Sequence, residues 1–260
     1  MPSLTQTLLL GAAFSTIMML FAWLFFFVTN RATIVDSFWV LTVTTLSLFY
    51  TLTPTLLTSS HFTLSFLILI WGIRLFFYLI YRFISYGEDP RYQYFKKRAV
   101  NRRSKFFLKI FLFQGFCAFL LTLPFAIYVR QILILGNIKI VGVIICIMAI
   151  IGESIADFQL AKFKKVNKGK ADMILNKGLW KYSRHPNYFF EWLFWIGVTT
   201  FMYQQPFRLM ILIPPILMFT LLYFVTGVKF SEEIMRGKKG PTFEKYLQST
   251  SSFVPWKPKK

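Results

Sequence analysis

The sequence predicts an all-α polytopic membrane protein built as a bundle of about seven transmembrane helices. Of its 260 residues, 56% are hydrophobic and 20% aromatic, whereas only 15% are charged. A soluble domain could not bury so much apolar surface, but apolar runs of about 20 residues are long enough to cross a bilayer as helices. We therefore expect residues 1–260 to form a single transmembrane domain.

Seven apolar runs account for the expected spans. The first is too long for a signal peptide and is followed by no small-residue cleavage site, so we expect it to be retained. The sixth is short, and the edges of the fifth and sixth are weak, which leaves counts of six and eight open. The expected spans are residues 7–29, 34–57, 62–84, 106–129, 133–155, 188–204 and 207–229.

The net charge of +20 has two interpretations, nucleic-acid binding and the bias of Lys and Arg toward cytoplasmic loops. The positions of the basic residues favour the loop bias. Eight of the 30 Lys and Arg lie in each of three segments, 85–109, 157–188 and 229–260. With seven spans, these three segments fall on one face of the membrane. We therefore expect a bacterial inner-membrane protein with its N-terminus outside and its C-terminus in the cytoplasm. Nucleic acid is not needed as a partner, whereas anionic membrane lipid would be attracted to this face.

Several common signatures are absent from the sequence. Cys117 and Cys146 lie in apolar runs, where a thiol usually packs, and His61 and His185 are too far apart in sequence to form a metal-binding motif. No Walker loop or Gly-x-Gly-x-x-Gly motif occurs. Any nucleotide must therefore bind among helix ends and basic loops, and we expect those cytoplasmic loops to form a cofactor pocket. The sequence leaves the oligomeric state open.

The stretch 178–191, Gly-Leu-Trp-Lys-Tyr-Ser-Arg-His-Pro-Asn-Tyr-Phe-Phe-Glu, places Arg184, His185, Asn187 and Glu191 within eight residues at the edge of an apolar span. Polar groups are costly there unless they are bound. Arginine suits a phosphate, histidine can donate to a phosphate or transfer a proton, and asparagine can recognise an amide. We expect a cofactor-binding segment, with a capped interfacial turn as the alternative.

Charged residues also occur inside the apolar runs and should face the interior of the bundle. Arg74 and Tyr78 are four residues apart, so they share one face of the third helix. The alternative to a functional role is a structural ion pair that ties helices together, such as Asp36 with Arg74, and the same alternative applies to Glu153 and Asp157. Glu153 and Asp157 are likewise four apart, at the expected end of the fifth helix, and two carboxylates on one face favour a donor-rich partner such as a ribose, an amide or an arginine.

The segment 86–94, Tyr-Gly-Glu-Asp-Pro-Arg-Tyr-Gln-Tyr, follows the third apolar run. Gly87 and Pro90 are expected to end the helix there. Arg91 would then lie near the interface as part of a phosphate clamp, or the segment would be a plain solvated turn.

Together these motifs make the chain resemble an uncharacterised bacterial branch of the steroid 5-alpha-reductase superfamily. That superfamily also contains isoprenylcysteine carboxyl methyltransferases and sterol C14 reductases. The motifs that support the resemblance are Val-Asp36-Ser-Phe-Trp, Trp71-Gly-Ile-Arg-Leu75, Gly87-Glu-Asp-Pro-Arg-Tyr92, Gln114-Gly115, Ala-Asp157-Phe-Gln, the 178–191 stretch, Thr226-Gly227 and the ending from Tyr246 to Pro255.

The resemblance implies that NADPH is held by the C-terminal helices and loops. Asp157, Asn187 and Glu191 match positions that contact the cofactor in the reductases. Tyr182 lies in the matching strip, and Lys164 stands near a phosphate-binding arginine position.

The resemblance also implies how the substrate is activated. In the reductases, an acid on the second helix and a tyrosine on the third polarise the substrate carbonyl. Here Asp36 would be the acid, and Tyr78, with Arg74, is the nearest phenol. Glu232-Glu233 and the Tyr246 to Pro255 ending are instead similar to the methyltransferases.

We therefore expect an NADPH-dependent reductase of a carbon–carbon double bond conjugated to a carbonyl, in a steroid-like or isoprenoid enone. Residues 1–105 would line the cavity for this lipophilic substrate, and residues 106–260 would bind the cofactor. Two alternatives stay open: an S-adenosylmethionine-dependent methyltransferase of a lipophilic substrate, and a membrane scaffold without enzymatic activity.

Overall fold

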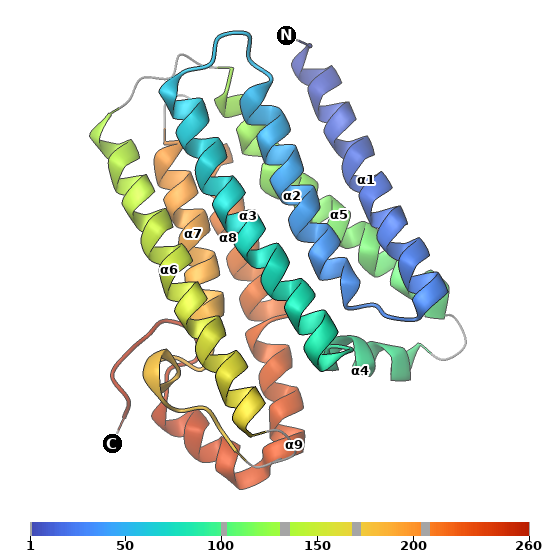
Figure 1. Cartoon of the computed structure of the whole chain (residues 1–260), viewed down its shortest axis with the longest axis vertical. Coiled ribbons are helices and arrows are strands. Elements are labelled where there is room, and N and C mark those ends of the chain that lie inside the picture. The colour runs from blue at the N-terminus through green and yellow to red at the C-terminus, as the bar shows by residue number, and fades with distance from the viewer. Residues whose placement is uncertain (1, 100–102, 131–135, 168–172, 204–208, 260) are drawn as a thin grey trace. The chain divides into compact units, whose positions relative to one another are not determined.

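The computed structural model of the chain describes residues 2–99, 103–130, 136–167, 173–203 and 209–259. The elements of this part are all helical, which confirms the predicted fold class (Figure 1). Six helices in it are long and apolar enough to cross a membrane. The chain divides into two compact units, unit 1 with residues 1–139 and 202–214, and unit 2 with residues 140–201 and 215–260.

Unit 1 contains the first four expected spans. They correspond to α1 (Leu4–Thr29), α2 (Ile34–Leu52), α3 (Ser59–Tyr86) and α5 (Arg103–Tyr128), as Figure 1 shows. A short helix, α4 (Pro90–Arg98), occupies what the sequence suggested was a turn. Proline is favoured in the first turn of a helix, and the Asp89 side chain caps α4 by accepting from the backbone N–H of Arg91, so this local sequence starts a helix.

The core of unit 1 is rich in aromatic side chains. Helix α1 packs against α2 and α5, and α2 packs against α3 and α5. Phe26 of α1 lies between Phe107 and Phe111 of α5, with ring centroids 4.5 and 5.9 Å apart, and Tyr92 of α4 joins the same buried cluster. This cluster fixes α4 against the ends of α1 and α5.

Unit 2 contains most of α6 (Asn137–Val166), the 3₁₀ turn η2 (Gly178–Lys181) and α7 (Pro186–Phe201). Helix α6 does not end near residue 155, as the fifth expected span did, but continues to Val166. The apolar run stops before that, but residues 156–166 contain no Gly or Pro and include several good helix formers, so the helix extends beyond the apolar segment. Glu153 and Asp157 therefore lie within the helix rather than at its end.

Helices α6 and α7 pack closely because glycines lie at their contact. A Cβ atom on Gly142 would lie 2.5 Å from the backbone nitrogen of Phe201, and one on Gly197 would lie 2.6 Å from Sγ of Cys146. Small residues allow membrane helices to approach in this way. Helix α7 has 16 residues, in agreement with the short sixth expected span.

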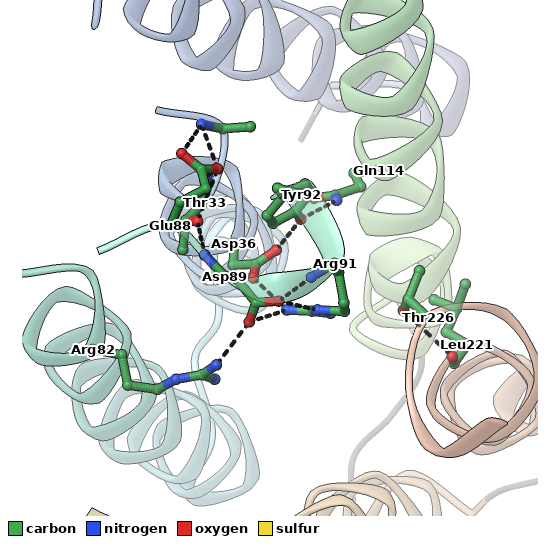
Figure 2. Close-up of polar contacts among 11 residues, drawn as sticks. Thr33, Asp36, Arg82, Glu88, Asp89, Arg91, Tyr92, Gln114, Leu221 and Thr226 are labelled. Atoms are coloured by element: carbon green, nitrogen blue, oxygen red, sulfur yellow. Dashed lines mark hydrogen bonds and ion pairs between the residues drawn. The ribbon is translucent and has the colours of Figure 1, made fainter. Parts of the chain in front are cut away.

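The seventh expected span lies largely within Met210–Gly237, which counts among the six helical segments able to cross a membrane, but its α-helix is interrupted. The turn η3 (Met210–Leu212) and the start of α8 (Ile213–Thr220) are followed by a π-helical turn, η4 (Leu221–Val225), and then by α9 (Val228–Ser249). The backbone N–H and hydroxyl of Thr226 both donate to the Leu221 carbonyl, and the hydroxyl contact is drawn in Figure 2. A Cβ on Gly227 would lie 1.7 Å from the Leu222 oxygen, so this break requires glycine.

The remaining elements complete the two units. The turn η3 belongs to unit 1, and most of α8 belongs to unit 2. Helix α9 bends at Gly240, which has a φ of +50° and precedes Pro241. Residues 133–135, 204 and 207–208, where expected spans begin or end, lie outside the described residues.

Candidate functional site

Two groups of polar residues stand out, one in each unit. The first is the α3–α4 corner, which consists of Asp36, Arg82, Glu88, Asp89, Arg91 and Lys96. Figure 2 shows the first five of these residues. Gly87 ends α3 with a φ of +71°, as the sequence predicted, and Pro90 begins α4 three residues later. The turn between these helices therefore places Glu88 and Asp89 side by side.

Glu88 ties the corner to the start of α2. Its carboxylate accepts from the backbone N–H groups of Ala32 and Thr33, at 2.9 and 3.0 Å, and Nζ of Lys96 lies 2.9 Å from it. The N–H groups that precede a helix need such acceptors, and a negative charge is favoured at that end. Glu88 therefore connects the α3–α4 turn to the α1–α2 turn.

Asp89 lies at the centre of the corner and is buried. It accepts from Nη2 of Arg82 at 2.8 Å and from Nε of Arg91 at 3.0 Å. Burial alone would raise the pKa of Asp89, but the charge and hydrogen bonds of Arg91, together with the charge of Arg82, outweigh burial and hold that pKa below its usual range. Asp89 is therefore a carboxylate at neutral pH.

Asp36 joins the corner from α2. Its Oδ2 accepts from Nη2 of Arg91 at 2.9 Å, and its Oδ1 accepts from the Tyr92 hydroxyl at 2.6 Å. Tyr92 in turn accepts from Nε2 of Gln114 at 3.1 Å. Burial and the nearby Asp36 raise the pKa of Tyr92 well above its usual value, so this phenol remains a donor. Asp36 is the acceptor in both of these contacts.

The expected catalytic residues on α3 lie in one strip. The guanidinium of Arg74 lies 5.6 Å from the ring centre of Tyr78, and that of Arg82 lies 5.8 Å from it. This confirms that Arg74 and Tyr78 share a face of the helix. Because Arg82 binds Asp89, and Asp89 and Asp36 both bind Arg91, the strip is connected to Asp36 through the α3–α4 corner.

In unit 2, the 178–191 stretch begins with a tight turn against α6. Gly178 has a φ of +61°, and a Cβ there would lie 2.4 Å from the Gln159 side chain. Gln159 accepts from the Leu179 N–H, and Nε1 of Trp180 donates to the Ala156 carbonyl, both at 3.0 Å. These contacts fix the stretch before its polar residues begin.

Arg184 binds the C-terminal part of the chain. Its Nε donates to Glu232 at 2.8 Å, and its Nη1 donates to the carbonyls of Leu247 and Thr250. Glu232 precedes the bend of α9 at Gly240, whereas Leu247 and Thr250 follow it. Arg184 thus fastens both parts of the bent helix to the 178–191 stretch.

His185 shares the carboxylate of Glu232, with 3.2 Å between Nε2 and Oε1, and its ring stacks on Tyr188 at 5.4 Å. Burial lowers the pKa of His185 and outweighs the hydrogen bond and charge of Glu232, which act in the opposite direction. His185 is therefore neutral at pH 7 and packs with Arg184 against α9.

Buried acidic residues lie on both α6 and α7, and one hydrogen bond from Asn187 joins the two helices. Asp157 accepts from Nδ2 of Asn187 at 3.3 Å, and Glu191, one turn further along α7, accepts from Nε1 of Trp195 at 2.9 Å. Glu153 lies one turn before Asp157 on α6, and the three carboxylate side chains are all buried. We call Glu153, Asp157, Asn187 and Glu191 the α6–α7 strip.

The other expected cofactor-binding residues are spread over both units. Lys164 lies in the last turn of α6, and Tyr182 is exposed and accepts from the Trp256 N–H at 2.9 Å through its carbonyl. Arg91 belongs to unit 1, where it binds Asp36 and Asp89. The structure therefore joins Asp157 to Asn187, with Glu191 one turn further along α7, and it groups Arg184 with His185 and Glu232.

One buried charge escaped the sequence analysis. Lys139 of α6 is only 2% exposed, and its Nζ donates to the Ser60 hydroxyl at 3.1 Å. The ammonium also lies 5.7 Å from the ring centre of Tyr128. A lysine inside the fifth expected span, residues 133–155, was the signal that could have revealed it.

Comparison with known proteins identifies the family of the chain. No curated protein and no solved structure matches the chain. Residues 22–250 match one family model, which covers most of the helices of both units and the polar groups described above. The chain, whose described part holds six helices long and apolar enough to cross a membrane, therefore belongs to the family described as "Protein of unknown function (DUF1295)".

Proposed function

We propose that this protein is a membrane-embedded NADPH-dependent reductase that acts on a carbon–carbon double bond conjugated to a carbonyl, in a lipophilic enone of steroid-like or isoprenoid type. The observation that supports it best is the α6–α7 strip. There Asp157 and Asn187 are hydrogen bonded across two apolar helices, and Glu191 follows one turn later. Ionisable groups buried in membrane helices usually mark a functional site.

The chemistry of the strip fits parts of this cofactor. Carboxylates accept from hydroxyl and amide N–H groups, and a carboxamide both donates and accepts. Asp157 therefore suits a ribose, and Asn187 with Glu191 suits the nicotinamide carboxamide. Exposed lysines of the same unit, such as Lys177 and Lys181, together with Lys164, supply positive charge for phosphates.

The contacts of Arg184 and His185 favour a structural role over the cofactor-binding role expected from the sequence. Both bind Glu232, and Arg184 also binds two backbone carbonyls of the C-terminal part. We therefore assign them to positioning α9 rather than to direct phosphate binding. Tyr182 keeps a cofactor-binding role, because its side chain is exposed beside Lys181.

We assign the activation of the substrate to residues of unit 1. When bound, NADPH supplies the hydride, and the substrate carbonyl oxygen then gains negative charge that a donor must stabilise. The Tyr78 hydroxyl is that donor, and the cations of Arg74 and Arg82, which lie 5.6 and 5.8 Å from the centre of its ring, favour the charge. Asp36 acts indirectly, by orienting Arg91 in the α3–α4 corner.

A ligand comparison tests the proposal. Purified protein in detergent is heated with NADPH or with S-adenosylmethionine over the same series of concentrations, and a ligand that reaches about a hundred times its dissociation constant should stabilise by about 2.7 kcal/mol. NADPH should raise the melting temperature of the wild type and of the exposed control variant Glu244→Gln, and it should have much less effect on Asn187→Ala.

The rival functions predict other outcomes. The buried carboxylates of the strip would also favour the cationic sulfonium and ammonium of S-adenosylmethionine, so a shift with that ligand alone would replace the reductase by a methyltransferase. A shift with neither ligand would favour the membrane scaffold.

A further inference from the structure

An open apolar groove runs along the last turns of α1. Its volume is about 510 Å³, within the range of roughly 300–1,000 Å³ that is typical of ligand pockets. Phe21, Leu24, Phe25, Val28 and Thr29 line it from α1, and Phe38 lines it from α2. Only 22% of the most apolar stretch of α1 is buried within the protein. The groove therefore faces the lipid around unit 1.

A cation lies at one end of the groove. The ring of Phe25 contacts that of Phe83 on α3, with centroids 6.5 Å apart, and the guanidinium carbon of Arg31 lies 3.7 Å from the centre of the Phe83 ring. Nη2 of Arg31 also donates to the Phe83 carbonyl at 2.7 Å. Arg31 directly follows Asn30, whose left-handed backbone ends α1. The charge of Arg31 therefore lies at the end of the apolar segment that lines the groove.

The surroundings of Arg31 favour a negatively charged ligand. Glu88, the acid that reaches the α1–α2 turn, already binds Lys96 and the N–H groups of Ala32 and Thr33. Lys96 also donates to the Asn30 carbonyl, which adds a second cation at this end of α1. An arginine presents five N–H donors in a fork that suits phosphate oxygens.

We propose that this groove binds one anionic phospholipid, with an acyl chain along α1 and its phosphate on Arg31. The segment of α1 that lines the groove, from Phe21 to Thr29, is about 12 Å long, because a helix rises 1.5 Å per residue. A second copy of the chain is a poorer occupant. In a symmetric membrane dimer through this face, both Arg31 side chains would lie at the same depth, where like charges repel. The lipid site is independent of the proposed reductase activity.

Native mass spectrometry of the detergent-purified full chain tests the site. The protein is titrated with phosphatidylglycerol and phosphatidylcholine that carry the same acyl chains. We expect phosphatidylglycerol to give the stronger one-lipid adduct. Arg31→Gln should weaken that adduct about fivefold, since a basic residue near a membrane surface contributes about 1 kcal/mol with anionic lipid. It should leave the phosphatidylcholine adduct unchanged.

Three further variants separate the groove from general effects. Leu24→Trp, which fills the groove, should weaken both adducts, and Arg31→Lys should retain part of the preference for phosphatidylglycerol. Arg98→Gln removes an exposed cation stacked on Tyr94, outside the groove, and should change neither. Melting temperatures identify any variant that fails to fold. Equal adducts of the two lipids in the wild type, an unchanged preference in Arg31→Gln, or a dimer that excludes lipid would overturn the proposal.

Discussion

Single charged residues hold the corner between α3 and α4, and Asp89 is central to it. Its carboxylate is buried and lies against two arginines, Arg82 and Arg91. Removing one partner of a buried ion pair leaves the other charges uncompensated. The same pairing lowers the pKa of Asp89, so the stability that it contributes must depend on pH.

We expect Asp89→Asn to destabilise the protein by about 3 kcal/mol, because two cations would lose their shared anion. Denaturant unfolding in detergent at pH 7 measures this. The exposed pair of Arg236 with Glu244 provides the control, since Glu244→Gln should cost less than about 1 kcal/mol. Equal effects of the two substitutions would refute the central role of Asp89.

The contribution of Asp89 has a definite pH window. Its folded-state pKa is below the unfolded value of about 3.9, so its contribution is complete above that pH and is lost as the pH falls further, through the folded-state pKa. Wild-type stability should fall steeply below about pH 4, and Asp89→Asn should show a shallower fall.

His185 gives a second pH window, in unit 2. Burial lowers its pKa from the ordinary value of 6.5, so the folded state favours the neutral ring. The unfolded chain then binds a proton more readily, and the stability from His185 falls as the pH drops below about 6.5. Melting temperatures between pH 5 and 7.5 should show this slope in the wild type and a weaker slope in His185→Gln. An identical slope in both proteins would contradict it.

At the scale of elements, the contact between α6 and α7 depends on small residues. Gly142, Gly152 and Gly197 lie where the helices touch, and this contact sets the register that brings Asp157 opposite Asn187. The polar α6–α7 strip is therefore a consequence of helix packing. Disturbing the glycines should disturb the strip as well.

Gly142→Ala should destabilise unit 2 by about 1–3 kcal/mol, because the added methyl group would lie 2.5 Å from the Phe201 nitrogen and force the helices apart. Gly237→Ala in α9 is the matched control. Nothing lies within 4 Å of its Cβ position, and alanine is the better helix former by about 0.5–1 kcal/mol. Thermal unfolding should show a lower melting temperature for Gly142→Ala than for Gly237→Ala. An unchanged melting temperature in Gly142→Ala would show that α6 and α7 pack less tightly than described.

At the scale of the whole molecule, the charge distribution predicts the topology. Basic residues concentrate in segments 85–109, 157–188 and 229–260, and cytoplasmic loops hold such excesses. Reporter fusions at Ser60 and after Lys260 should therefore report opposite compartments, with the second in the cytoplasm. The same compartment for both would refute the predicted topology.

The sequence predicted the spans better than the contacts. Apolar length located α1, α2, α3 and α5 to within a few residues, because a membrane helix needs about 20 apolar residues. It did not reveal α4, whose composition is polar, or the extension of α6 to Val166. Nor did it pair Asp36 with Arg91, since the two residues are 55 positions apart and only the packing of α2 against the α3–α4 turn brings them together.

The polar residues of unit 2 show the same limit. The spacing of Arg184, His185, Asn187 and Glu191 identified an unusual segment, but it could not divide their roles. The fold separates them, because Arg184 and His185 face Glu232 of α9 while Asn187 faces Asp157 of α6. Which tertiary partner each side chain meets depends on helices that are distant in sequence.

The central claim is that the α6–α7 strip binds NADPH, and equilibrium dialysis of purified protein with NADPH tests it most directly. The wild type and the exposed control Glu244→Gln should bind with the same dissociation constant. Asp157→Asn removes the buried charge opposite Asn187 while keeping the shape of the side chain, and it should raise that constant about tenfold, the effect of losing about 1.4 kcal/mol. An unchanged dissociation constant in Asp157→Asn, or no NADPH binding by the wild type, would contradict the account.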